Sequence, residues 1–420
     1  MLDIFDRIER DSGGPIGQYF DQAFGYYMYP RLEGELGPHM IFNGKEVLNW
    51  SLNNYLGLAN HPEVRKADAQ GAADWGLAYP MGARMMSGHT RYHEKLEKMF
   101  ADFEQKEDAF LFNFGYQGIF STIDAITTRH DVIVYDAECH ACLMDGIRLH
   151  MGSKYKYRHN NIADCEKVLA RACAEADANG GGVLLITEGV YGMTGALGKL
   201  DEIAALKDKY SFRILIDDAH GFGLLGEHGR GTSEHFGVMD KIDLYIGAFA
   251  KSMASIGGFV AGPHKIINYL RANLRSQMYA KSLPMPLVIG NIRRMEIINS
   301  PEGDELRAKC WKITHAIQNG FKEMGLDIGE AEACVTPVHI PGGVNQASKM
   351  AKDLRENYRI FCSVVVYPVI PKGMVIFRIV STASHTMEDV EYTLNAFKEI
   401  KAKLDAGEYD GDDFAAMTVE

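Results

Sequence analysis

Three short runs of apolar and β-branched residues lie within residues 212–262, which read FRILIDDAHGFGLLGEHGRGTSEHFGVMDKIDLYIGAFAKSMASIGGFVAG. The runs are FRILIDDAHG, DLYIGAFAK and GGFVAG, and each is bounded by glycines, acids or small residues that are typical of turns. Four similar runs precede them, with helical patterns between: AFLFNFG, DVIVYDA, SKYKYRHN and GVLLITEGV. This alternation predicts an α/β fold with a mostly parallel, seven-stranded sheet and helices on both faces. Ligands of such sheets bind beyond the carboxyl ends of the strands.

The pattern changes on either side of this region. MIFNGKEVLNW predicts a β-hairpin with Asn43 and Gly44 as its turn, and Pro62 opens a helix. After about residue 290, long helices flank the apolar runs CVTPVHIP, IFCSVVVYP and MVIFRIVST, which favours a smaller α+β domain. Thr386 and Asp389 predict the cap of its last helix. We expect an N-terminal arm and hairpin at 1–60, a large domain at 61–290, a small C-terminal domain at 291–405 and an acidic tail at 406–420.

Composition limits the class of protein. Of the 420 residues 46% are hydrophobic and 24% are charged, which is typical of a globular protein and excludes a disordered chain. The net charge of −12 disfavours nucleic acid as a partner. No apolar run approaches the ~18 residues of a transmembrane helix, although peripheral contact with a membrane stays open. Seven cysteines, an odd number, and no signal-peptide pattern at the start indicate a cytoplasmic protein with reduced thiols.

Two polar clusters follow strands and invite a metal interpretation. Asp217, Asp218 and His220 end one predicted strand, but no further cluster of ligands completes a metal shell. Cys139 and Cys142 form a CxxC pair, and zinc would need a second pair that the sequence lacks. We therefore expect no metal site; an ordinary turn and helix cap is the alternative for the first cluster.

A lysine and a carboxylate at the ends of two strands suggest another chemistry. Lys251 follows the run DLYIGAFA, and Asp217 ends the run before it. Pyridoxal phosphate needs an amine for its Schiff base and an acid facing its pyridinium nitrogen. Gly115 stands at a strand-to-helix turn where backbone amides bind phosphate, and His140 could stack on a flat ring. Taken singly, Lys251 could be a solvated surface lysine and Gly115 an ordinary turn.

Eight motifs occur in the order seen in the α-oxoamine synthases, and the chain resembles this family over roughly residues 40 to 400. The motifs are SLNNYLGL, GARMMSGHTRYHEKLE, FNFGYQG, DAECHACLMDG, TEGVYGMTG, DDAHGFGLLGEHGRG, AFAKSMASIGGFVAG and VIFRIVSTASHT. Members are pyridoxal 5'-phosphate enzymes of the fold-type I aminotransferase class. Within the family, YRHNN and DDAHGFGLLGEHGRGTSEHFG are most similar to bacterial serine palmitoyltransferases, with a cysteate-using, sulfonolipid-forming relative as a variant.

The resemblance implies a role for each matching residue. Lys251 would form the Schiff base, Asp217 would pair with the ring nitrogen, His220 would approach the ring hydroxyl and His140 would stack on the ring. Four further contacts are implied: the backbone amides of Gly115 and Tyr116 for the cofactor phosphate, and the side chains of Asn53 and Arg378 for the amino-acid carboxylate.

The implied reaction joins a small amino acid to a long-chain acyl thioester, of coenzyme A or acyl carrier protein, with loss of carbon dioxide. Serine would give a 3-keto sphingoid base, and cysteate would give a capnine-type sulfonolipid precursor. Glycine or alanine as substrate is the alternative. A non-catalytic subunit of a lipid-synthesis complex is a second alternative, but such subunits in this family lack the Schiff-base lysine. The resemblance also implies a homodimer.

Several positions depart from the family pattern. Ala248 and Ala250 replace hydroxyl residues beside the lysine, and Gly192 replaces a serine. Lys281 stands in the segment that reaches across the dimer, where relatives carry threonines, and a cation there could hold the phosphate. Lys281 and Arg84 could instead supply positive charge for the sulfonate of cysteate; Lys281 could also be an exposed lysine.

Overall fold

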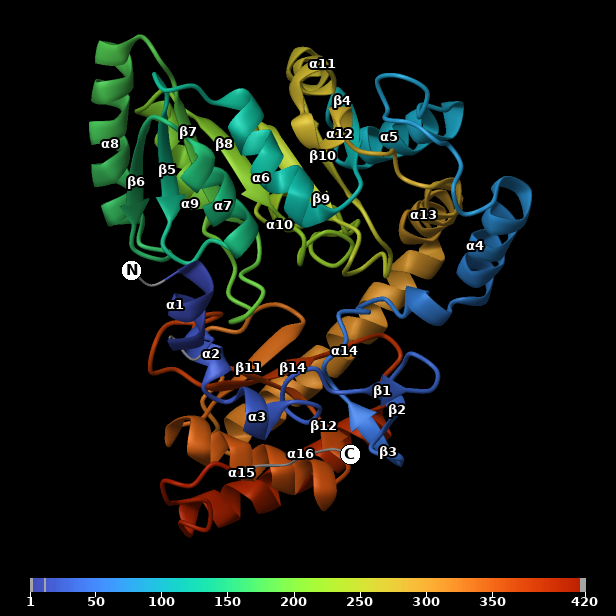
Figure 1. Ribbon diagram of the computed structural model, residues 1–420, viewed down its shortest axis with the longest axis vertical. Coiled ribbons are helices and arrows are strands. Elements are labelled where there is room, and N and C mark those ends of the chain that lie inside the picture. Colours follow the sequence, from blue (N-terminus) through green and yellow to red (C-terminus); the bar gives the residue numbers. More distant parts are fainter. Residues whose placement is uncertain (1–2, 11–12, 416–420) are drawn as a thin grey trace. The chain divides into compact units, whose positions relative to one another are not determined.

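The computed structural model describes residues 3–10 and 13–415 and divides the chain into two compact units. One unit comprises Met1–Leu52, Met193–Gly195 and Lys309–Glu420, and the other comprises Asn53–Gly192 and Ala196–Ala308 (Figure 1). The N-terminal segment thus belongs with the C-terminal part of the chain. The boundary between the two units after Ala308 falls within α14 (Pro301–Glu323). The change of sequence pattern suggests a boundary near residue 290, about twenty residues earlier.

The Asn53–Ala308 unit is built on a seven-stranded sheet, as the sequence predicts. Its strand order is β4-β10-β9-β8-β7-β5-β6, and β10 runs antiparallel to both of its neighbours while the other pairs are parallel. All seven predicted runs form strands: β4 (Asp108–Phe112), β5 (Val132–Asp136), β6 (Ser153–Tyr157), β7 (Val183–Glu188), β8 (Arg213–Asp217), β9 (Leu244–Ala248) and β10 (Gly258–Gly262).

Helices cover both faces of this sheet. Leu215 of β8 and Leu184 of β7 share one apolar core with α6 (Gly115–Ile126), α7 (Ala141–Leu149) and α11 (His264–Asn273). On the opposite face, Phe100 of α5 (Arg91–Phe103) stacks on Phe259 of β10, with ring centroids 4.1 Å apart. The other helices of this unit are α4 (Pro62–Trp75), α8 (Ile162–Asn179), α9 (Leu200–Ala205), α10 (Thr232–His235), α12 (Arg275–Met278) and α13 (Met285–Ile298).

The second unit contains two small sheets, ordered β1-β2-β3-β12 and β11-β14-β13. The predicted hairpin is confirmed, because Asn43 (φ 50°) and Gly44 (φ 71°) form the left-handed turn that such loops require. IFCSVVVYP, expected as one strand, divides into β12 and β13, which pair with different sheets. The strands are β1 (Leu32–Glu33), β2 (His39–Phe42), β3 (Lys45–Asn49), β11 (Val335–His339), β12 (Ile360–Phe361), β13 (Ser363–Val365) and β14 (Ile376–Val380).

The last helix of this unit begins as the sequence predicts. Thr386 and Asp389 form a reciprocal capping box at the start of α16 (Met387–Asp405). Trp50 is fully buried beside it, and its indole N–H donates to the Thr393 hydroxyl at 3.0 Å. The remaining helices are α1 (Ile4–Arg10), α2 (Gly14–Gly17), α3 (Phe20–Ala23) and α15 (Gly343–Glu356). Among the described residues, no helix is long and apolar enough to span a bilayer.

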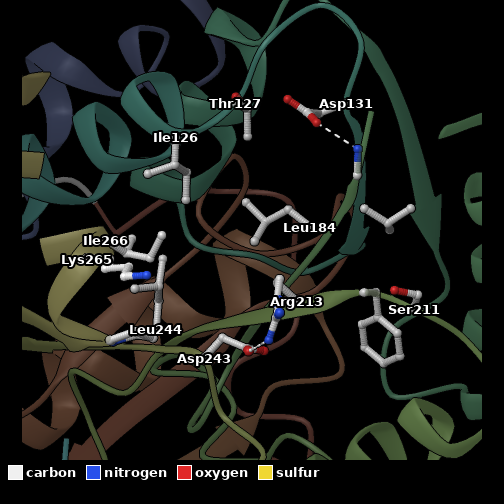
Figure 2. A pocket seen from close by; sticks show the side chains of 14 residues that line it. Ile126, Thr127, Asp131, Leu184, Ser211, Arg213, Asp243, Leu244, Lys265 and Ile266 are labelled. Atoms are coloured by element: carbon white, nitrogen blue, oxygen red, sulfur yellow. Dashed lines mark hydrogen bonds and ion pairs between the residues drawn. The ribbon is translucent and has the colours of Figure 1, made fainter. Parts of the chain in front are cut away.

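A cavity of about 510 Å³ opens at the amino ends of β7, β8 and β9. Figure 2 shows Ile126, Leu184 and Leu244 around it, and the charged Arg213 and Asp243 at its rim form an ion pair at 2.7 Å. The polar residues singled out from the sequence lie at the other end of these strands. The cavity is therefore separate from the candidate site described next.

Candidate active site

Two carboxylates end neighbouring strands and face the same side of the sheet. Glu188 of β7 and Asp217 of β8 are partners in the strand register. Side chains alternate between the two faces of a strand, and Ile186 and Leu215 belong to the core beneath α6 and α7. Glu188 and Asp217 therefore point toward the same face, at the carboxyl edge where parallel sheets bind ligands.

His140 joins these carboxylates from a third strand. It follows β5 and caps α7, where its imidazole accepts a hydrogen bond from the backbone N–H of Cys142. The backbone N–H of His140 donates to Glu188 Oε1 at 2.5 Å. The Cys142 thiol lies 2.9 Å from His140 Nδ1 and donates to Asp217 Oδ2 at 3.6 Å. The structure thus brings together two of the expected residues, His140 and Asp217, through the intervening thiol.

Burial dominates the electrostatics of the two carboxyls. Burial raises the pKa of Asp217, and the nearby His140 and Lys251 side chains oppose this shift. Burial and the neighbouring Asp217 together raise the pKa of Glu188 well above its usual range. Asp217 is only 5% exposed. A buried carboxylate of this kind favours a cationic partner, which a protonated ring nitrogen would supply.

Lys251 lies in a tightly closed turn after β9. Phe249 N donates to Gly257 O at 3.0 Å and Ser255 N donates to Phe249 O at 2.8 Å, which closes the turn. The next side chain, Ser252, is anchored by its hydroxyl to the Phe222 carbonyl at 2.6 Å. Lys251 itself is half-buried, and its charge acts on Asp217. The turn therefore presents the amine to the same edge of the sheet as the acid.

The strand-to-helix turn at Gly115 has the form expected for a phosphate site. Gly115 begins α6, and the N-cap residue before it, Phe114, makes no side-chain hydrogen bond to the start of the helix. A Cβ on Gly115 would lie 3.0 Å from Ala248 Cβ, so the small residues at both positions let α6 approach β9 closely. The Tyr116 phenol is directed to Asp145 by a hydrogen bond that raises its pKa to about 12. The start of α6 thus keeps its backbone amides for a ligand.

Lys281 and Arg84 differ in what their surroundings allow. Lys281 is exposed, and its carbonyl accepts a hydrogen bond from Asn113, two residues before Gly115 in the same chain. Arg84 is buried; its guanidinium donates to Glu97 Oε1 at 2.9 Å and to His89 Nδ1 at 3.0 Å. These contacts occupy Arg84 and do not favour its use as a substrate ligand, whereas Lys281 is an exposed residue.

The amino-acid ligands implied by resemblance lie in different units. Asn53 is half-buried at the start of the unit that carries Lys251. Arg378 belongs to the other unit, where it is buried on β14 opposite Pro337 and Ser363.

Among the described residues, no group of three or more His, Cys, Asp or Glu side chains could hold a metal ion.

Three residues beside the site went unassigned in the sequence interpretation: Tyr55, Cys142 and Glu188. Tyr55 donates to or accepts from His220 Nδ1 at 2.6 Å, and both residues are buried. Each of the three lies within a motif that carries the family resemblance. The motifs give no sign of these contacts, because the hydrogen-bond partners are far apart in the chain. Tyr55 lies 165 residues from His220, Cys142 lies 75 from Asp217, and Glu188 lies 48 from His140.

The chain belongs to the aminotransferase class I and II family, whose family model matches residues 45–397. It has the fold-type I architecture and is a pyridoxal phosphate-dependent acyltransferase, as the α-oxoamine synthase resemblance implies. It is 58% identical over 409 residues to a cysteate-C-fatty acyltransferase of Capnocytophaga ochracea, covering 97% of both chains.

Solved structures give the same class. A serine palmitoyltransferase of Sphingomonas wittichii superposes with a TM-score of 0.88 at 28% identity, over 96% of this chain and 100% of that one. A high-resolution structure of SPT with PLP also superposes with a TM-score of 0.88, at 25% identity over 96% of this chain and 100% of that one.

Proposed function

We propose that this chain condenses cysteate with a long-chain acyl thioester to give a capnine-type sulfonolipid base. The observation that carries the proposal is the 58% identity to a cysteate-C-fatty acyltransferase over nearly the full length of both chains. Serine is the second candidate, because a serine palmitoyltransferase shares the fold at 28% identity. Glycine and alanine are weaker alternatives. The presence of Lys251 argues against a non-catalytic subunit.

The reaction balances without an oxidant or reductant. The thioester carbon–sulfur bond breaks, a carbon–carbon bond forms at the amino-acid α-carbon, and the carboxylate of cysteate leaves as carbon dioxide. The products are a 3-keto amine that keeps the sulfonate, carbon dioxide and the free thiol of coenzyme A or acyl carrier protein. The α-carbon loses its proton before the carbon–carbon bond forms and regains one after carbon dioxide leaves, and the released thiolate takes up the one proton that the reaction consumes overall.

The residues at the carboxyl edge of the sheet fit the cofactor. Pyridoxal phosphate, when bound, supplies an electron sink for the charge that develops at the α-carbon. We assign the buried Asp217 to the ring nitrogen, His140 to the ring face, and the amides of Gly115 and Tyr116 to the phosphate. Lys251 would hold the bound cofactor and would move protons at the α-carbon as general base and then general acid.

Substrate recognition requires two anionic groups to be matched. Asn53 and Arg378 are assigned to the carboxylate, for which the bidentate guanidinium is well suited. Lys281 is assigned to the sulfonate, because it is an exposed cation whose backbone carbonyl is bonded to Asn113, two residues before Gly115. Arg84 is left out of this assignment, since its guanidinium is bonded to Glu97.

A homodimer is proposed because exposed apolar side chains gather on connected segments near the site. Four of them are more than 70% exposed: Leu77, Met81, Met86 and Tyr279. Two backbone hydrogen bonds join these segments, Met285 N to Tyr79 O and Ser282 N to Gly82 O, both at 2.9 Å. A patch of this kind is typical of a protein interface.

The seven cysteines are all free thiols, which supports a cytoplasmic location.

A binding experiment tests the choice of amino acid. Each of cysteate, serine, glycine and alanine is titrated into the cofactor-loaded protein, and the change in the cofactor absorbance band gives a Kd. We expect cysteate to bind most tightly, with serine at least roughly tenfold weaker, because the serine complex leaves the sulfonate contacts unmade. Serine binding as tightly as cysteate would leave a serine palmitoyltransferase as the better assignment.

A further inference from the structure

The imidazole of His220 is held from one side by Tyr55. The Tyr55 hydroxyl lies 2.6 Å from His220 Nδ1, and the two rings meet edge to face with centroids 6.0 Å apart. Tyr55 is fully buried and His220 is 9% exposed. Because Tyr55 is enclosed by the core, it offers a fixed point to which the imidazole is bonded.

The other edge of the same imidazole lies against Gly192. A Cβ placed on Gly192 would come within 2.3 Å of His220 Nε2, 2.6 Å of Cδ2 and 2.9 Å of Cε1. All three distances are shorter than any real contact of a Cβ atom. The ring edge opposite Tyr55 thus occupies the space that any side chain at position 192 would need.

Glycine at 192 is required by space rather than by backbone conformation. Gly192 is absent from the glycines with positive φ, a group that includes Gly223 (φ 81°) in the loop after His220. An L-residue would therefore not need the left-handed backbone that favours glycine at this position. What it could not do is coexist with the present position of the imidazole.

We propose that Gly192 and Tyr55 are positioning residues that together fix the imidazole of His220 for the cofactor. The inference rests on the proposed function in one respect, the assignment of His220 to the ring hydroxyl of pyridoxal phosphate. To clear a Cβ at 192, the ring must move by about 1 Å, and Nδ1 starts only 2.6 Å from the buried phenol. Movement toward Tyr55 creates a clash, and a swing of this size away from it takes the pair beyond hydrogen-bond distance.

The test compares Gly192→Ala, Tyr55→Phe and the double variant with the wild-type chain. Gly182→Ala is the matched control, because a Cβ on Gly182 meets only Asp131 Oδ1, at 3.7 Å, which is ordinary contact. Cofactor Kd is measured by absorbance titration, together with the position of the absorbance band and the melting temperature. We expect each single variant to bind pyridoxal phosphate roughly tenfold more weakly, and the control to bind as the wild type does.

The double variant separates positioning from independent damage. If both residues act through one imidazole, the double variant should bind pyridoxal phosphate no more than about threefold more weakly than whichever single variant has the lower affinity. The inference would be overturned if Gly192→Ala bound the cofactor with a Kd within twofold of the wild type. It would also be overturned if the losses of affinity in the two single variants multiplied in the double variant. Tyr55→Phe removes one hydroxyl without adding volume, so it answers the question even if Gly192→Ala fails to fold. Cofactor affinity is read without any amino acid, so failure of the cysteate assignment would leave this result unaffected.

Discussion

Replacing Asp217 with asparagine should have opposite effects on the cofactor-free protein and on cofactor binding. The carboxyl is 5% exposed, and burial raises its pKa above the ordinary value of 3.8. A group whose pKa is higher in the folded state binds protons more readily there than in the unfolded chain. Its ionisation therefore destabilises the folded protein progressively as pH rises from the ordinary value through the raised one.

Asparagine has nearly the same shape and stays neutral at every pH. Its amide oxygen can still accept from Ala219 N, which donates to Asp217 Oδ1 at 3.1 Å. Each unit by which the folded state raises the pKa of Asp217 costs about 1.4 kcal/mol of stability once the carboxyl is ionised, and the neutral amide avoids this cost. The cofactor-free Asp217→Asn protein should accordingly melt at a higher temperature than the wild type, and the difference should grow as pH rises from the ordinary pKa of 3.8 through the raised pKa of the Asp217 carboxyl.

The same substitution should weaken the cofactor. Removing one partner of a buried ion pair costs about 3–5 kcal/mol, which corresponds to at least roughly a hundredfold in Kd. Differential scanning fluorimetry of the cofactor-free protein and absorbance titration of pyridoxal phosphate measure the two effects. An Asp217→Asn protein whose cofactor Kd lies within threefold of the wild type would refute the assignment of this carboxylate to the ring nitrogen.

Lys251→Ala should fold with a normal melting temperature yet lose turnover and the ability to trap cofactor with borohydride; a residual rate above about a hundredth of the wild type would contradict its role. Met81→Glu with Met86→Glu should convert dimer to monomer in sedimentation and loosen the cofactor, whereas a dimer that persists would place the interface elsewhere. Lys281→Ala should weaken cysteate roughly tenfold while leaving serine within twofold, and equal losses for both would instead connect Lys281 with the cofactor phosphate. Arg84→Ala, by contrast, should lower the melting temperature without changing the cysteate-to-serine ratio, because the buried Glu97 loses its closer cationic partner and keeps only Arg271 at 3.8 Å.

The strands of the sheet were predictable because their signals are local. Each apolar run is bounded by its own turn residues, so β4 to β10 could be placed from the sequence alone. The capping box at Thr386 depends on residues only three apart. The division of IFCSVVVYP into β12 and β13 was not predictable, since β12 pairs with β3, more than 300 residues earlier.

The site was predictable in its chemical groups and less so in their surroundings. Lys251, Asp217 and His140 follow strands whose carboxyl ends meet at one edge. The contacts that tune them join distant segments, as Cys142 does with Asp217 and Tyr55 with His220. Arg84 shows the converse case, because a cation inside a family motif proves to be bonded to Glu97, a partner that no spacing rule identifies.

A direct competition assay tests the central claim. Cysteate and serine are supplied together at equal concentration to the cofactor-loaded enzyme with one long-chain acyl thioester, and the two keto amines are counted by mass spectrometry. The ratio of products equals the ratio of kcat/KM values, so no separate rate constants are needed. The account predicts that the sulfonate product exceeds the serine product at least roughly tenfold. A serine product equal to or greater than the sulfonate product would contradict it.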